Sequence, residues 1–268
     1  STTWNQGQYY NAWCPEDRNG PDGRVWTGCG ATAMAQIMRH HAYPNQGTGS
    51  YTYFHAVYGN LSADFGAATY TWSAMPNALS DYNDEVARLL YHCGVSIKMD
   101  YSPEGSWAYA TDIAVALKTY FKYNASNYLW REDYVSTYWL TLLRENIDES
   151  WPIFYRGAAS DNSGGHFFVL DGYQGANYFH INWGWGGAFD GYFYLDNAVP
   201  GGFDYSHFQG AIVNITPRIC NMPPAIIVPT TSNARNYTVS WTASNTPSAV
   251  YILEEATSPD FSLGLRSV

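Results

Sequence analysis

The spacing of the apolar residues changes once along the chain, at about Pro152, and this change constrains the fold most strongly. Before Pro152, apolar residues recur every three to four positions, which is the period of amphipathic helices. After it, short apolar runs are separated by Gly and Asn, a pattern typical of strands joined by tight turns in an antiparallel sheet. Helices followed by a run of strands predict an α+β domain.

Four segments of the first part have the helical period, and five runs of the second part are predicted strands. Thr27 is the expected cap of the first helix, and Pro44 is expected to end it. The helices are expected at 27–41, 81–93, 106–121 and 132–149, and the strands at 153–155, 166–172, 178–183, 191–195 and 211–215.

The composition shifts again near Pro217, which predicts a first domain at 1–217 and a linker at 218–224. The remaining segment, 225–268, contains a strictly alternating run at 237–241 with an expected neighbouring strand. A β-sandwich of the immunoglobulin or fibronectin type takes about 100 residues and seven strands. The segment is therefore expected to be the truncated start of such a partial β-sandwich, or else a small β appendage to the first domain.

Charge and composition exclude several classes of protein. The net charge of −10 argues against nucleic-acid binding, which needs a basic face to replace the counterions of the phosphates. Charged residues make up 13% of the chain and aromatic residues 18%, the opposite of a disordered sequence. No apolar window approaches the ~18 residues of a membrane span. We therefore expect a folded protein with a large core, without nucleic-acid partners and without a membrane span.

Cys29 is the first candidate for chemistry. It lies between Gly28 and Gly30 at the expected N-terminus of the first helix, where free backbone N–H groups and the helix dipole favour an anion. Because a thiolate is the nucleophilic form of cysteine, this position lowers the cost of activating it. The alternative is a buried cysteine that packs as a small hydrophobic residue.

His166 is the matching candidate for a general base. It begins an apolar strand directly after a pair of glycines, in the run GGHFFVL. A cysteine nucleophile needs a base that becomes imidazolium and pairs with the thiolate. The separation of Cys29 and His166 falls within the ~130–150 residues quoted for papain-type proteases. The alternative is a core histidine whose ring nitrogens are hydrogen-bonded within the protein. This alternative fits the other six histidines better than His166.

Three further residues could complete such a site. Asn182 could accept the N–H of the His166 ring and fix its tautomer, and the neighbouring Trp183 could shield that bond from water. Acyl transfer also needs donors aimed at the developing oxyanion, and the side-chain amide of Gln6 could be one of them. The alternatives are a glycine-rich turn with core tryptophans for 182–183 and a surface side chain for Gln6.

The remaining cysteines support no metal site. None of the four is in C-x-x-C spacing, so neither zinc nor any other cofactor is expected. If Cys29 is kept for chemistry, at most one disulfide can form. Cys14 could pair with Cys93 or with Cys220, and the spacing leaves both pairings open.

Three segments closely resemble the active-site segments of the streptopain family of papain-like cysteine peptidases. They are TGCGATAMAQIMRHHAYP, GGHFFVLDGY and INWGWGGAFDGYFYLD, and the likeness extends from about Trp4 to about Pro217. The resemblance implies a papain-like two-part fold, in which a helical part carries the cysteine, an antiparallel sheet carries the histidine, and the cleft lies between them. The segment after Pro217 lies outside the resemblance.

The resemblance also implies a role for each candidate residue. Cys29 matches the nucleophile, His166 the general base, and Gln6 the glutamine of the oxyanion hole, where the Cys29 N–H is the second donor. Trp183 matches the tryptophan near the histidine, and either it or Asn182 orients the ring. Members of the family are secreted bacterial enzymes made as zymogens, which implies a pro-segment that inhibits the enzyme before maturation and has no counterpart here.

The expected function is therefore that of a mature, secreted or cell-surface cysteine endopeptidase that acts on protein or peptide substrates through a thioester acyl-enzyme. Amidases, transglutaminases and cell-wall peptidases use the same pair of residues and are the first alternative. A glycan-binding or adhesin module is a weaker alternative, motivated by the many Trp and Tyr residues, whose faces can stack on sugars.

Overall fold

The computed structural model describes residues 2–161 and 164–218 and, beyond these, four two-residue strands. The chain divides into two compact units, Ser1–Pro217 and Arg218–Val268. In the second unit, β11 (Ile226–Ile227) pairs with β12 (Ser240–Trp241), and β13 (Glu254–Glu255) pairs with β14 (Arg266–Ser267), both antiparallel. Most of the predicted linker and of the predicted partial β-sandwich at 225–268 lies outside the described residues, so both stay predictions.

The first unit contains a helix for each helical segment that the sequence predicts, with ends that differ by a few residues. These helices are α1 (Cys29–His41), α2 (Asp84–Ser96), α3 (Ala110–Thr119) and α4 (Ser136–Asp148). Helix α2 begins as capping rules require, because the side chain of Asn83 accepts the Val86 N–H at 3.0 Å.

Each of the five strands predicted between residues 153 and 215 overlaps one strand of a single six-stranded sheet, in which all neighbouring strands are antiparallel. The α+β class is therefore confirmed. Strands β5 to β8 form a meander, and β9 returns to the free edge of β5. The order across the sheet is β4 (Leu129–Trp130), β9 (His207–Ile212), β5 (Ile153–Ala158), β6 (Gly165–Gln174), β7 (Tyr178–Asn182) and β8 (Gly191–Tyr194).

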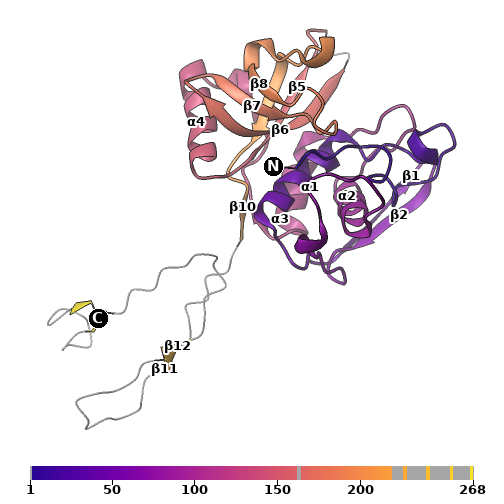
Figure 1. The fold of residues 1–268 in the computed structure, drawn as a ribbon, viewed down its shortest axis with the longest axis horizontal. Coiled ribbons are helices and arrows are strands. Elements are labelled where there is room, and N and C mark those ends of the chain that lie inside the picture. Colours follow the sequence, from indigo (N-terminus) through magenta and orange to yellow (C-terminus); the bar gives the residue numbers. More distant parts are fainter. Residues whose placement is uncertain are drawn as a thin grey trace. The chain divides into compact units, whose positions relative to one another are not determined.

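Helices cover both faces of this sheet, and Figure 1 shows α4 beside the strands and α1 with α2 and α3 in the other part of the unit. Side chains of β6 alternate between the two faces, so one strand supplies two cores. Phe167 and Val169 pack in the core that contains α1. Phe168 and Leu170 pack in the core that contains Trp139 of α4. Strand β6 therefore links both layers, and His166 stands near its beginning.

Two strand pairs of the first unit have no counterpart among the predicted strands. One is the hairpin of β1 (Ser50–His55) and β2 (Gly59–Asp64), and the other joins β3 (Tyr123–Asn124) to β10 (Thr216–Pro217). In β2 the buried positions are Leu61 and Ala63, which alternate with Asn60, Ser62 and Asp64. So few apolar residues give a weak strand signal.

Cys14, Cys29 and Cys93 are free thiols, so the pairing of Cys14 with Cys93 is absent. Cys220 lies outside the described residues. Burial raises the pKa of the Cys14 thiol to about 12. Within residues 2–161 and 164–218, no helix has both the length and the apolar character needed to cross a membrane.

Candidate active site

Cys29 is the first residue of α1, and a glycine turn places it there. Gly28 is the N-cap residue, with φ 86° and ψ 140°, a conformation that favours glycine. A Cβ at Gly28 would also lie 2.6 Å from the side chain of Met99. The prediction that Thr27 caps the helix was wrong, because its hydroxyl pairs with that of Thr32 at 3.1 Å instead.

The surroundings of the Cys29 sulfur act on its pKa in two directions. Burial raises the pKa, and it is the largest effect. Hydrogen bonds from the backbone N–H groups of Phe167, Gly30 and Cys29 itself lower it, and so does the positive charge of Arg156. Because Phe167 directly follows His166, this interaction places the histidine-bearing strand beside the sulfur of Cys29.

His166 is 6% exposed and is held by one backbone carbonyl. Its Nε2 lies 2.7 Å from the carbonyl oxygen of Trp183, which can only accept, so Nε2 carries the hydrogen. In the neutral ring, Nδ1 is therefore the nitrogen that can take a proton. Burial lowers the pKa of His166 to about 4, and the hydrogen bond to Trp183 opposes this shift.

The structure differs from the expectation that the Asn182 side chain bonds to His166. Asn182 stands opposite Val169 in the β6–β7 register, so its side chain points to the face that carries α1. His166 lies on the other face of β6. The Asn182 amide pairs with Gln36 of α1, and the carbonyl of Trp183 accepts the imidazole hydrogen in its place.

Trp183 lies beside the histidine, as the sequence predicts. Its indole is fully buried, and its ring centroid is 6.2 Å from that of His166 at an interplanar angle of 23°. Its backbone N–H donates to Asp190 at 2.8 Å, and its indole N–H donates to the Phe189 carbonyl at 3.1 Å. The ring of Trp185 is closer to His166, at 4.8 Å, so two tryptophans exclude water from the imidazole.

Gln6 lies between the segment that precedes Cys29 and the turn that follows Trp183. Its backbone carbonyl accepts the N–H of Thr27 at 3.0 Å, two residues before Cys29. Its side-chain Nε2 donates to the carbonyl of Gly184 at 3.4 Å, directly after Trp183. A long hydrogen bond is easily exchanged for a better acceptor, which suits a donor reserved for an oxyanion.

Two further residues contact this site and were not predicted from the sequence. The ring of Tyr205, from the loop before β9, lies 5.2 Å from that of His166. Burial and then the negative charge of Cys29 raise the pKa of Tyr205 to about 12. Arg156 of β5 is the cation that acts on Cys29. No motif distinguishes either residue in the sequence, since both reach the site only through the folding of the sheet.

Over the part of the chain that the structure describes, no three His, Cys, Asp or Glu side chains are grouped to hold a metal ion. The donors near Cys29 are backbone N–H groups and an arginine, which bind anions rather than cations.

A cysteine at the start of a helix and a histidine near the start of a strand in an antiparallel sheet are features of the papain-like architecture. The model of the Peptidase C10 family matches residues 4–193, and the chain belongs to this family. The active wild-type interpain A cysteine protease of Prevotella intermedia has a similar structure. It aligns with a TM-score of 0.73 and 37% identity, over 79% of this chain and 91% of that one. The predicted papain-like fold is thus confirmed.

Sequence relatives agree with this assignment. Streptopain of Streptococcus pyogenes is 34% identical over 244 residues, which cover 80% of this chain and 60% of that protein. The thiol protease/hemagglutinin PrtT of Porphyromonas gingivalis is 34% identical over 243 residues, which cover 85% of this chain and 27% of that protein. A prointerpain A fragment of Prevotella intermedia aligns with a TM-score of 0.69 and 36% identity, over 80% of this chain and 69% of the fragment. The chain therefore spans less than two thirds of the length of the streptopain that it matches.

Proposed function

We propose that this chain is a cysteine endopeptidase in which Cys29 attacks the scissile carbonyl and His166 transfers the protons. The observation that carries the proposal is that the residue after His166 acts on the sulfur of Cys29. The nucleophile begins α1, and the residue after the base, Phe167, donates a hydrogen bond to its sulfur. Streptopain and interpain A, a cysteine protease by name, support the same reaction class.

The proposed reactive form is a thiolate–imidazolium pair. Burial opposes each charge when it forms alone, raising the pKa of Cys29 and lowering that of His166. Every specific contact favours the charged forms: the N–H donors and Arg156 stabilise the thiolate, and the Trp183 carbonyl stabilises the imidazolium. Moving the thiol proton to Nδ1 creates both charges together, and a buried pair is favourable when such hydrogen bonds support it.

The reaction follows from this geometry. The thiolate adds to the carbonyl carbon, and the oxyanion accepts hydrogen bonds from the Gln6 amide and the Cys29 N–H. His166 gives its Nδ1 proton to the leaving amine as the C–N bond breaks, which leaves a thioester on Cys29. Water then loses a proton to His166 and attacks the thioester, and the acid product and the thiol are released.

The test of the activity is cleavage of casein and of a peptide library, with and without a cysteine-protease inhibitor. Cys29→Ala and Cys29→Ser should abolish turnover while the fold, measured by circular dichroism, is kept. Cleavage of casein by Cys29→Ala would disprove the assignment. Isolated amides, glutamine-transfer substrates and peptidoglycan fragments belong in the same screen, because turnover of one of them alone would assign the non-peptidase alternative.

The test of the ion pair is the pH dependence of iodoacetamide labelling. Labelling of Cys29 should persist at acidic pH, whereas a free thiol reacts only near its pKa of ~8.5. Cys14 and Cys93 are internal controls, because burial raises the pKa of both thiols and should keep them unlabelled in the folded protein. Labelling of Cys29 that begins only near the free-thiol pKa would contradict the pair.

We also propose that the enzyme is secreted by a bacterium and made with an inhibitory pro-segment. The name prointerpain A, given to a fragment of a related protein, supports a precursor form. An antibody against this chain should detect it in the culture medium of the source organism, preceded by a larger precursor. Protein found only inside the cells, at a single size, would contradict this proposal.

The glycan-binding alternative loses part of its motivation. Trp4, Trp139 and Trp183 are among the largest fully buried side chains, so they are not free to stack on sugars. Glycan-array binding that survives Cys29→Ala, without any peptidase activity in the unmodified protein, would restore that alternative.

A further inference from the structure

We propose that Gln36 of α1 is a positioning residue for this site, acting on His166 through the Asn182 side chain and the Trp183–Gly184 peptide. The proposal deepens the proposed function and rests on it for its catalytic readout. Neither Gln36 nor an indirect role for Asn182 follows from the roles that the family resemblance implies.

The peptide group between Trp183 and Gly184 is hydrogen-bonded through both its C=O and its N–H. Its carbonyl oxygen accepts the hydrogen of His166 Nε2 at 2.7 Å. Its N–H, carried by Gly184, donates to Oδ1 of Asn182 at 3.0 Å. Because the peptide group is planar, holding its N–H in one direction also holds its C=O in the opposite direction. The Asn182 side chain therefore sets the direction of the carbonyl that orients the imidazole.

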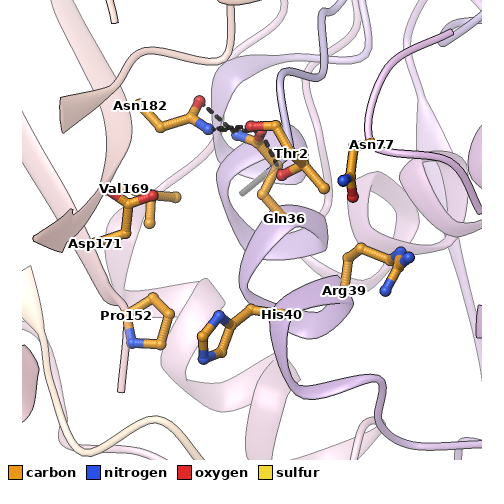
Figure 2. Close-up of a pocket in the computed structure, with 9 residues that line it drawn as sticks. All are labelled: Thr2, Gln36, Arg39, His40, Asn77, Pro152, Val169, Asp171 and Asn182. Carbon is orange, nitrogen blue, oxygen red and sulfur yellow. Dashed lines mark hydrogen bonds between the residues drawn. The ribbon is translucent and has the colours of Figure 1, made fainter. Parts of the chain in front are cut away.

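The orientation of the Asn182 amide is set in turn by Gln36. Asn182 and Gln36 form a reciprocal amide pair, in which each NH₂ group donates to the other oxygen at 3.1 Å. Figure 2 shows the two side chains meeting beside Thr2. Both are almost completely buried, with 3% and 4% exposed surface respectively. If the Asn182 amide were turned by 180°, its NH₂ group would face Gln36 Nε2 and the Gly184 N–H. Both of these groups are donors, so they would be left unpaired.

The orientation of Gln36 is set by a group that can only donate. The backbone N–H of Trp4 donates to Oε1 of Gln36 at 3.2 Å, and the Thr2 hydroxyl donates to the same atom at 2.9 Å. Oε1 is thus the acceptor, and Nε2 is left to donate to Asn182 Oδ1. The Thr2 carbonyl accepts from Asn182 Nδ2 at 2.5 Å and favours the same arrangement.

The position of Gln36 makes this network a link between the three parts of the site. Gln36 follows Cys29 by about two helical turns on the same helix face. Trp4 donates its backbone N–H to Gln36 and precedes Gln6 by two residues. Asn182, which accepts from Gln36, directly precedes Trp183. One buried amide therefore couples the nucleophile helix, the oxyanion segment and the turn that orients the base.

The experiment compares Gln36→Met with Asn146→Leu as a matched control. Methionine keeps the side-chain volume, whereas alanine would extend the neighbouring cavity of about 220 Å³, which Gln36 lines (Figure 2), and admit water. Asn146 is a buried amide of α4, 3% exposed, that bonds to the Leu142 carbonyl and the Asn214 N–H. Both variants lose a buried amide, and only Gln36→Met loses one that is linked to His166.

For Gln36→Met we expect kcat to fall about tenfold to 100-fold, as for other residues that orient a functional imidazole. The KM should stay within about twofold, because ground-state binding is unchanged. Acid-range labelling of Cys29 by iodoacetamide should be lost. Asn146→Leu should show a comparable fall in melting temperature, with wild-type kcat and labelling. A kcat loss for Gln36→Met no larger than that of the control would overturn the proposal.

Gln36→Glu keeps the test decisive if Gln36→Met does not fold. The carboxylate still accepts from Trp4 and Thr2, but once ionised it cannot donate to Asn182 Oδ1. We expect activity to fall as the pH rises through the pKa of the new carboxyl, a limb that the wild type lacks. A wild-type pH profile for this variant would overturn the proposal.

The labelling readout separates this proposal from the proposed function. If the wild type cleaves no peptide, yet Gln36→Met loses the acid-range labelling that Asn146→Leu keeps, the positioning role stands and the proposed substrate class fails. If the wild type cleaves peptides and Gln36→Met behaves as Asn146→Leu in both readouts, the function stands and the positioning role fails.

Discussion

Replacing Gly184 by alanine should damage the site from behind the histidine. Gly184 has φ +69°, in the left-handed region, where a residue with a Cβ costs ~1–2 kcal/mol. The added Cβ would also lie 3.1 Å from Cγ2 of Thr32. Thr32 is not free to turn away, because its hydroxyl bonds to the Gly28 carbonyl and to Thr27, both at 3.1 Å. The turn carrying Gly184 must therefore move.

The size of the effect follows from what this turn holds. The backbone strain alone should lower the melting temperature by ~2–8 °C, at ~2–4 °C per kcal/mol for a unit of this size. Movement of the turn also displaces the Trp183 carbonyl from His166 and the Gly184 carbonyl from Gln6. A misplacement on the order of 1 Å costs about 100-fold in rate. We expect kcat of Gly184→Ala to fall about tenfold to 100-fold, measured on a peptide substrate below the melting temperature of the variant.

Gly175→Ala is the matched control for this prediction. Gly175 lies in the exposed turn between β6 and β7, has φ +58°, and has no atom within 4 Å of the position of an added Cβ. It carries the same type of backbone strain without the contact and without the link to His166. It should lose a similar part of its stability and keep wild-type kcat. Equal kcat values for the two variants would refute the reasoning.

Three other perturbations have definite expected outcomes. Burial lowers the pKa of His41 and of His92 to about 4 in the folded protein, below the unfolded value of ~6.5. Only the unfolded chain takes up these protons between those values, so stability to urea should fall as the pH drops from ~6.5 towards 4 and should not fall between pH 7 and 8. Asn83→Ala should cost ~1 kcal/mol in urea unfolding by uncapping α2, with kcat unchanged, and a loss in kcat would contradict a purely capping role. Arg156→Gln should raise the pKa of Cys29 and move iodoacetamide labelling to higher pH, whereas an unchanged profile would show that the guanidinium does not act on the thiol.

Local sequence patterns predicted most of the helices and strands of the first unit. The four helices and the strands of the main sheet were predicted because their apolar residues repeat with the period of a helix or form short runs between turns. The hairpin of β1 and β2 was missed because β2 contains few apolar residues, and the pairing of two strands is not defined by one local segment. The sheet order, with β9 returning to β5, also exceeds what local patterns can specify, since pairing of distant strands depends on the whole core.

In the candidate site, too, some features follow from local sequence and others only from the tertiary structure. Cys29 and His166 were predicted as candidates from their immediate neighbours, a glycine turn before a helix and a glycine pair before a strand. The role predicted for the Asn182 side chain differs from the structure because the side of the sheet that it faces depends on strand register. Tyr205 and Arg156 could not be found, because a loop and a neighbouring strand bring them to the histidine and the thiol.

The sequence by itself determined the class of the chain, an α+β domain with a helix-borne cysteine, a strand-borne histidine and the motifs of a peptidase family. Tertiary structure alone decided how the histidine is held: its Nε2 bonds to a backbone carbonyl, and the conspicuous asparagine bonds to the N–H of the same peptide group and to a buried glutamine of α1. The physical reason is that residue types and periods are local properties. Which side chain meets which across a sheet depends on register and on the packing of two layers, and no local segment contains that information.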